Sequence, residues 1–286
     1  MSAASMTGYM RGLYKLAWRR KAAFVGGVVA LLMLLAAIMA PWLAPYDPNE
    51  QDILLRMAGP SEAHWLGNDT YGRDILSRII WGGRISLFIG VASIGLAMII
   101  GGLLGILAGY VGGRTDRLIM SLMDMMLSFP SLVMGLLVVA VLGPTTMNLI
   151  IAIAFTAIAP FARIARAPTL AVKQRDFIEA GRALGYSDLR IMVVHVLPNI
   201  LDEILVLASL WLATAIRTEA SLSFIGLGVR PPTATWGGMI RDGFENMLDA
   251  PGLVIYPSIA ILIIMIALNL LGDGLRDATD PKLRHE

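Results

Sequence analysis

The sequence predicts an all-α, polytopic membrane protein with six transmembrane helices and both termini in the cytoplasm. The chain is 57% hydrophobic and only 15% charged, with a mean hydropathy of +0.71, whereas soluble domains are typically about 25% charged. Its apolar residues gather in long uncharged runs, and most Lys and Arg residues lie in alternate connections between those runs. Length and charge bias of this kind are typical of membrane-spanning helices with a defined orientation.

The first uncharged run, residues 22–46, is long enough to cross a hydrocarbon core about 30 Å thick. It follows residues 1–21, which contain five Lys or Arg residues and no acid. A cleaved signal peptide has a similar arrangement, but its apolar core holds only about 7–15 residues. Pro41 after the small residue Ala40 is also expected to block cleavage. We therefore expect a retained first span, preceded by a cytoplasmic segment.

The connection after the first span, residues 47–84, is polar, and Pro, Gly, Asn and Asp mark turns in its first half. From Gly72 onwards the pattern becomes helical, with Ile75 and Ile79 on one face and charged residues on the other. This pattern predicts an extracytoplasmic loop that ends in a short amphipathic helix at the membrane surface.

The second span lies within residues 85–113, which carry no charge. Its glycines recur at every fourth position, so they form a smooth helix face that another helix can approach closely. The alternative is a flexible, poorly packed helix. The glycines in this series are Gly101, Gly105, Gly109 and Gly113.

Four further apolar runs predict the remaining spans, so that residues 85–272 form a core of five transmembrane helices. The third run contains Asp124 and Pro130, and the fourth extends toward Arg163 and Arg166. A polar tail, residues 273–286, closes the chain. The four runs are residues 118–142, 148–161, 200–226 and 251–272.

The distribution of basic residues predicts the orientation. Of the 23 Lys and Arg residues, 16 lie in segments on the side of the termini, six lie on the opposite side, and Arg217 lies within the fifth span. Cytoplasmic segments carry the excess of Lys and Arg, so both termini and the connection between the fourth and fifth spans are expected in the cytoplasm.

Several classes of function are excluded or disfavoured by what the sequence lacks. The chain has no cysteine, which excludes disulfides and thiolate chemistry, and it has no P-loop or hydrolase motif. Its three histidines are far apart in sequence. We therefore expect no catalytic residues, no cofactor, no metal site and no nucleic-acid partner, and any ATP-driven motion must come from another protein.

The cytoplasmic connection at residues 167–199 contains the longest charged stretch of the second half, residues 175–199. It predicts a short helix that stops at Gly185, and a second short helix that Ser187 caps. Pro198 is expected to end the second helix and begin the fifth span. Small and apolar residues on the first helix favour insertion into a groove of a partner protein, and the alternative is a connection that lies on the bilayer.

This stretch resembles the EAA loop of permease subunits of ATP-binding cassette (ABC) importers, through E-A-G-R-A-L-G and H-V-L-P-N. Gly181 departs from the family pattern, because that position is usually Ala. Residues 64–90, 219–237 and 272–284 are similar to the second, C-type permease subunit of dipeptide and oligopeptide transporters, a subfamily that also includes nickel and glutathione importers.

The resemblance implies a type I importer permease fold in the inner or plasma membrane of a bacterium, surrounded by membrane lipids. It implies three kinds of protein partner: a sister permease in a heterodimer, two ABC ATPase subunits, and an extracytoplasmic substrate-binding protein. A stand-alone secondary transporter is an alternative, but it leaves the docking loop unexplained. The resemblance implies contact with the ATPase through Phe177, Ile178, Glu179, Ala180, Gly181, Ala183, Leu184, Gly185 and Pro198.

Charged residues inside the spans are candidates for a translocation path, because charges at membrane depth usually face protein or water. Arg217 and Glu219 qualify, and the alternatives are an ion pair between helices or a side chain that reaches the outer surface. Asp124 lies near the cytoplasmic end of its span, where a structural hydrogen bond is the favoured role.

Overall fold

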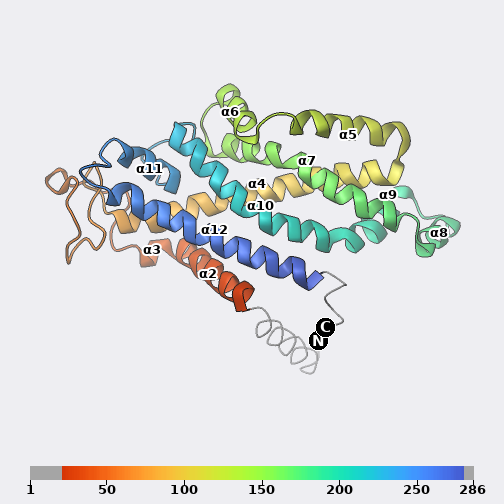
Figure 1. Cartoon of the computed structure of the whole chain (residues 1–286), viewed down its shortest axis with the longest axis horizontal. Helices are drawn as coiled ribbons and strands as arrows, with labels where there is room; N and C mark the ends of the chain where they lie inside the picture. Colours follow the sequence, from red (N-terminus) through yellow and green to blue (C-terminus); the bar gives the residue numbers. More distant parts are fainter. Residues whose placement is uncertain (1–20, 280–286) are drawn as a thin grey trace.

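The computed structural model describes residues 21–279, and within this range its only strand-like pairing is an isolated bridge between Asn68 and Asp74. The helices form an elongated bundle, with α8 at one end and α11 at the other (Figure 1). Five helices are long and apolar enough to cross a membrane, and a bent pair brings the number to six if it is counted as one span. The five are α2 (Lys21–Ile38), α4 (Ile75–Val111), α7 (Thr146–Val172), α10 (Leu197–Ile225) and α12 (Gly252–Thr279), and the pair is α5 (Gly113–Leu127) with α6 (Ser131–Leu142).

The packing of α4 against α7 forms the centre of the bundle, and it depends on glycines of α4. A Cβ atom at Gly101 would lie 2.5 Å from the carbonyl oxygen of Ile158, and one at Gly105 would lie 2.2 Å from that of Ala162. Gly109 meets the next turn of α7 in the same way. Because no side chain separates the two backbones at these positions, the helices approach closely along three turns.

Gly113 has a different role, so its expected place in this packing series is wrong. It begins α5, its φ is +58°, and a Cβ atom there would meet nothing within 4 Å. The preceding Gly112 also has a positive φ, of +75°. Left-handed backbone conformations favour glycine, so this pair turns the chain from α4 into α5.

The first span is shorter than residues 22–46, because α2 ends at Ile38 and a separate short helix, α3 (Ala40–Leu43), follows. Pro41 lies near the start of α3. Proline has no backbone N–H and disfavours the helical conformation of the residue before it, so a continuous helix is interrupted here. Further along, a single 3₁₀ turn, η1 (Ile53–Leu55), is the helical element of the polar connection before α4.

Helices α2 and α12 pack in opposite directions. A Cβ atom at Gly26 would lie 2.6 Å from the carbonyl oxygen of Ala267, and one at Gly274 would lie 2.1 Å from the Cβ of Ala23. The beginning of α2 therefore lies beside the end of α12, as expected for termini on one side of the membrane. Most residues of segments 1–21 and 273–286 that were assigned to the cytoplasm lie outside the described residues.

Helix α4 is continuous over 37 residues, so the separate amphipathic surface helix expected before the second span is not formed. The side chain of Asp74 caps the helix by accepting a hydrogen bond from the backbone N–H of Ser77 at 2.7 Å. Gly82 and Gly83 lie within the helix and pack against Trp236. The polar residues of the first turns are covered by the outer loops instead of facing the membrane surface.

The third span is broken, although the sequence predicted one helix over residues 118–142. Helices α5 and α6 meet at 93° across a short break that contains Pro130. Proline cannot donate the helical hydrogen bond and constrains the residue before it, so the bend occurs at this position. The turn after α6 reaches the outer end of the bundle, where Pro144 lines a cavity together with Gly226 and Arg230. The bent pair therefore connects the inner end of α4 to the start of α7, and it brings the number of spans to six if it is counted as one.

Three other elements extend or add to the expected spans. Helix α7 continues to Val172 through Pro160 and Pro168, and α12 continues to Thr279, well beyond residue 272. The polar segment of residues 229–250 contains α11 (Trp236–Phe244), which the sequence did not predict. Thr235 caps α11 by accepting from the N–H of Gly238 at 3.1 Å.

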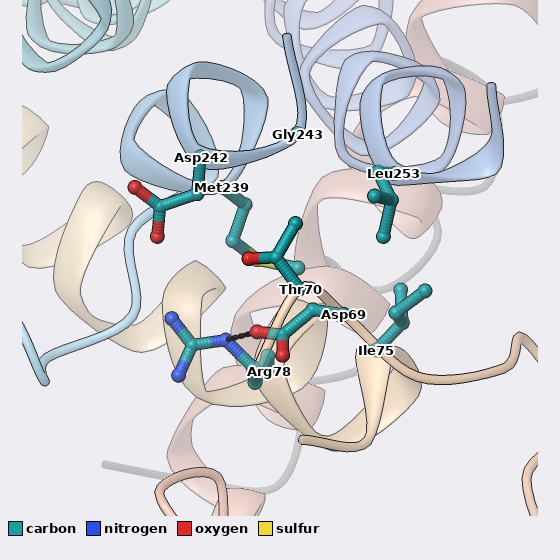
Figure 2. Close-up of a pocket in the computed structure, with 8 residues that line it drawn as sticks. All are labelled: Asp69, Thr70, Ile75, Arg78, Met239, Asp242, Gly243 and Leu253. Carbon is teal, nitrogen blue, oxygen red and sulfur yellow. Dashed lines mark ion pairs between the residues drawn. The ribbon is translucent and has the colours of Figure 1, made fainter. Parts of the chain in front are cut away.

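Buried ion pairs hold the outer loops to α4 and α11. Asp69 accepts from the Nε of Arg73 at 2.7 Å and lies 3.3 Å from the Nε of Arg78. Figure 2 shows Asp69 and Arg78 beneath α11, which contributes Asp242 and Met239 to the same pocket. Arg73 and Arg78 are each only 3% exposed. Because buried charges are stable only when they are paired, this cluster fixes the polar connection against α11.

Candidate coupling site

The cytoplasmic end of the bundle is built around α8 (Asp176–Ala183), which projects beyond the spans (Figure 1). The helix ends at Gly185, whose φ is +78°. The N–H of Gly185 donates to the carbonyl of Arg182 at 2.9 Å, and that of Tyr186 donates to the carbonyl of Gly181 at 3.0 Å. This pair of bonds is the Schellman arrangement, which satisfies the last carbonyls of a helix and requires a left-handed residue.

The two faces of α8 differ. Ile178 is only 1% exposed and Gly181 is also buried, so these two residues hold the helix against the rest of the chain. The opposite face presents small and apolar side chains to the outside, with Phe177 43% exposed and Leu184 72% exposed. We call this the outer face of α8, and it consists of Phe177, Glu179, Ala180, Ala183, Leu184 and the adjoining Gly185.

Gly181, which departs from the family pattern, packs against Tyr186. A Cβ atom at this position would lie 3.2 Å from the Cδ2 of the tyrosine ring. This distance is tighter than ordinary van der Waals contact, so the ring must move slightly to accommodate alanine. Gly181 therefore lies on the inner side of α8, and its effect on a partner is indirect.

Tyr110, at the inner end of α4, connects the spans to the segment after α8. Its hydroxyl donates to the Oδ1 of Asp188 at 2.7 Å, in the first turn of α9 (Asp188–Arg190). The guanidinium carbon of Arg182 lies 5.3 Å from the centroid of the Tyr110 ring, and the Nζ of Lys173 lies 5.6 Å from it. The interaction with Tyr110 raises the pKa of Arg182 above its usual value. One aromatic ring thus contacts α7, α8 and α9.

The second short helix does not end at Pro198. Helix α9 passes into a π-helical segment, η2 (Ile191–Val196), which continues directly into α10. Residues 188–225 therefore form one helix, in which Pro198 occupies the first turn of α10. Within the π-helical segment, His195 stacks on Tyr186 with ring centroids 5.7 Å apart. The π-helical segment therefore joins α9 to α10 without a non-helical linker.

Tyr110 and Tyr186 were missed by the sequence-based prediction. Tyr110 stands near the end of a long uncharged run, where tyrosine commonly marks the membrane–water interface. That signal could have indicated the depth of Tyr110 but could not identify Asp188, 78 residues away, as its partner.

The candidate path residues lie in different surroundings. Glu219 is completely buried, and its Oε1 accepts from the Oγ of Ser223 at 2.7 Å. The side chains of Ser86 and Thr235 also lie beside it. Glu219 therefore joins α10 to α4 and to the start of α11, and it does not face a passage, contrary to expectation. Arg217 is exposed and remains a candidate.

Asp124 forms an ion pair with Arg163 of α7 at 2.5 Å, and both side chains are more than half exposed. Within residues 21–279, no group of three or more His, Cys, Asp or Glu residues is arranged to hold a metal ion.

Comparisons with known proteins identify the family. Residues 101–285 match the model of the binding-protein-dependent transport system inner membrane component. Residues 12–60 match the N-terminal transmembrane domain of oligopeptide transport permease C.

Curated relatives match along almost the whole chain. The glutathione transport system permease protein GsiD of Pectobacterium atrosepticum is 44% identical over 93% of this chain and 90% of its own length. The di/tripeptide transport system permease protein DppC of Pseudomonas aeruginosa is 44% identical over 93% of this chain and 89% of its own length. The probable D,D-dipeptide transport system permease protein DdpC of Escherichia coli is 42% identical over 94% of this chain and 91% of its own length.

A solved structure supports the fold. The MetNI methionine ABC transporter in an inward-facing conformation contains a chain that superimposes with a TM-score of 0.58 at 17% identity, covering 72% of this chain and 98% of that chain. The order of the spans, the projecting α8 and the family matches lead to one conclusion. This chain belongs to the family of inner membrane components of binding-protein-dependent transport systems, the permease subunits of ABC importers.

Proposed function

We propose that this chain pairs with a sister permease to form the pathway for di- and oligopeptides, and that two ATPase subunits drive it through the outer face of α8. The chain is a multi-pass inner-membrane permease of an ABC importer, a machine that works with ATPase and substrate-binding partners. The observation that carries the coupling proposal is the geometry of α8: one face is held inward by Ile178, and the other exposes Phe177 and Leu184 together with Glu179.

The names of the relatives support a peptide substrate. The three relatives are permease proteins of transport systems for glutathione, for di- and tripeptides, and for D,D-dipeptides. All of these solutes are short peptides that carry an ammonium group and at least one carboxylate. Glutathione is therefore the second candidate, within the same chemical class.

A sister permease is supported by apolar surface that this chain leaves uncovered. On α5, Leu118 is 68% exposed and Leu122 is 54% exposed, and on α6 Val141 is 83% exposed. Lipid can cover such residues, but the polar groups beside them on α5 need protein or water. A second permease against this side meets both requirements.

The proposed coupling step follows the contacts at the inner end. Closure of the ATPases displaces α8, and the Schellman turn at Gly185 passes the displacement to α9. From there it reaches α4 through the hydrogen bond between Tyr110 and Asp188, and α10 through the π-helical segment. Two of the spans are thus moved together.

The test replaces residues at the outer face and its turn in the assembled importer. Glu179→Arg reverses an exposed charge, and Gly185→Asp places a charged side chain on the outer face at a residue whose φ is +78°. We expect a loss of copurifying ATPase or of uptake on the order of tenfold for each. Glu62→Arg, an exposed charge reversal in the outer loop, is the matched control.

Normal uptake and normal ATPase binding by both α8 variants would disprove docking at this face. Uptake into vesicles by the purified chain alone, without ATPase subunits, would disprove the wider proposal. Identification of the ligand that copurifies with the partner binding protein decides between peptides and glutathione.

A further inference from the structure

A polar cleft of about 540 Å³ lies between α5 and α7. Five charged side chains and a serine line it, so it contrasts with the apolar surface around it. These residues are Asp116, Arg117, Ser121, Asp124, Arg163 and Arg166.

Two ion pairs cross the cleft. Arg166 donates to both carboxylate oxygens of Asp116, at 2.5 and 2.6 Å. Arg163 donates to Asp124 at 2.5 Å, and in this pair the side chains are 53% and 59% exposed. An exposed pair of this kind contributes only about 0–1 kcal/mol to stability, so its two partners can be exchanged for other charged groups with little loss.

The position of the cleft along the spans follows from the packing of α4 on α7. Gly105 meets Ala162 and Gly109 meets Arg166, near the inner end of the uncharged part of α4. The cleft therefore lies at the inner end of the spans. Charges at this level must face protein or water and not hydrocarbon.

The surface of α5 shows what borders the cleft. Asp116, Ser121 and Asp124 all line the cleft, and Met123, seven residues after Asp116, is buried against the core. Another side of the helix is apolar and exposed, and it lies next to the side that faces the cleft. A sister permease on this apolar side would leave the polar cleft between the two subunits. The residues of the apolar side are Leu118, Leu122 and Met125.

We propose that the cleft between α5 and α7 is the inner mouth of the translocation path, where passing solutes that carry both an ammonium and a carboxylate exchange partners with the exposed Arg163–Asp124 pair. This inference rests on the proposed function. A passage needs contacts that admit a solute and release it again. The guanidinium of Arg163 and the carboxylate of Asp124 are already paired with each other, so a zwitterionic solute only replaces an existing ion pair. Neither group therefore binds such a solute tightly, and the solute is released again.

The experiment uses the absence of cysteine from this chain. Single-cysteine variants are assembled with cysteine-free partners, reconstituted in vesicles, and treated from the cytoplasmic side with a bulky, membrane-impermeant maleimide. Ser121→Cys places the thiol in the cleft, and Leu122→Cys places it on the neighbouring apolar side. Asp273→Cys, on the exposed inner part of α12, is a control for modification of the cytoplasmic surface.

We expect Ser121→Cys to react at least tenfold faster than Leu122→Cys and to lose uptake of a labelled dipeptide once it is modified. Asp273→Cys is expected to react without loss of uptake. Slow reaction of Ser121→Cys, or full uptake after its modification, overturns the inference. When the complex assembles and transports before modification, either of these two results counts against the cleft alone. A complex that does not assemble with the ATPases counts against the proposed function.

Discussion

The close contact between α4 and α7 provides a quantitative test through Gly105→Ala. The added Cβ would lie 2.2 Å from the carbonyl oxygen of Ala162 and 2.8 Å from the Cβ of Ala165. Both neighbours belong to the backbone or to its first side-chain atom, so no rotamer change can relieve the contact. The two helices must separate by roughly 1 Å to restore ordinary van der Waals distances.

The expected magnitude follows from two opposing effects. Overpacking of this kind costs about 1–3 kcal/mol, and alanine gains up to about 1 kcal/mol over glycine in helix propensity. Gly102→Ala is the matched control on the same helix, because its Cβ would meet only the Cδ1 of Ile204 at 3.9 Å. The control keeps the propensity gain without the clash. Because the propensity gain is common to both variants, they should differ in the free energy of unfolding by the overpacking cost alone, about 1–3 kcal/mol.

The assay is reversible unfolding of the purified chain in mixed micelles, followed by circular dichroism as the fraction of denaturing detergent increases. Gly105→Ala should unfold at a lower fraction than the wild-type chain, and Gly102→Ala at the same or a higher one. Equal midpoints for the two variants would refute the close approach of the two backbones.

Three further changes test other contacts. Tyr110→Phe removes the hydrogen bond to Asp188, so it should destabilise the inner end by about 1 kcal/mol and weaken ATP-dependent uptake. Tyr71→Phe in the outer loop is the control and should do neither. Equal uptake by the two variants would exclude Tyr110 from coupling. Asp69→Asn leaves buried arginines without their shared carboxylate and should cost about 3–5 kcal/mol in the same unfolding assay, against no change for the exposed Asp249→Asn. Burial raises the pKa of Asp242, so the folded state binds a proton at this carboxylate more readily than the unfolded state does. The stability that this proton contributes therefore falls as pH rises from about 4 through the folded pKa. Asp242→Asn should remove that fall, and an unchanged pH profile would contradict the shift.

Hydropathy and turn chemistry predicted the positions of the spans well, but they did not predict where helices are interrupted. Pro41 and Pro130 interrupt helices, while Pro160 and Pro168 lie within the continuous α7. The residues are identical in type, and neighbouring helices decide whether a proline is accommodated. The separate amphipathic helix before the second span was a wrong prediction for a related reason. Its polar residues are buried under α11, which no local pattern indicated.

The candidate coupling site was predictable in part. Gly185 and Ser187 specify a turn and a cap through their local conformational preferences, and both have those roles in the structure. The division of α8 into an inner and an outer face could not be read from its sequence. Ile178 and Phe177 are both large and apolar, and only the contact with the rest of the chain buries one and exposes the other.

The sequence by itself predicted the membrane class and the number of apolar spans, and it predicts an orientation, because hydropathy and charge act along the chain and need no knowledge of distant neighbours. It also indicated the family, through short local motifs. Only the tertiary structure decided that Glu219 is buried, that Tyr110 holds Asp188, and that α5 and α7 enclose a charged cleft. The physical reason is that each of these features depends on residues distant in sequence, whose meeting is set by the packing of whole helices.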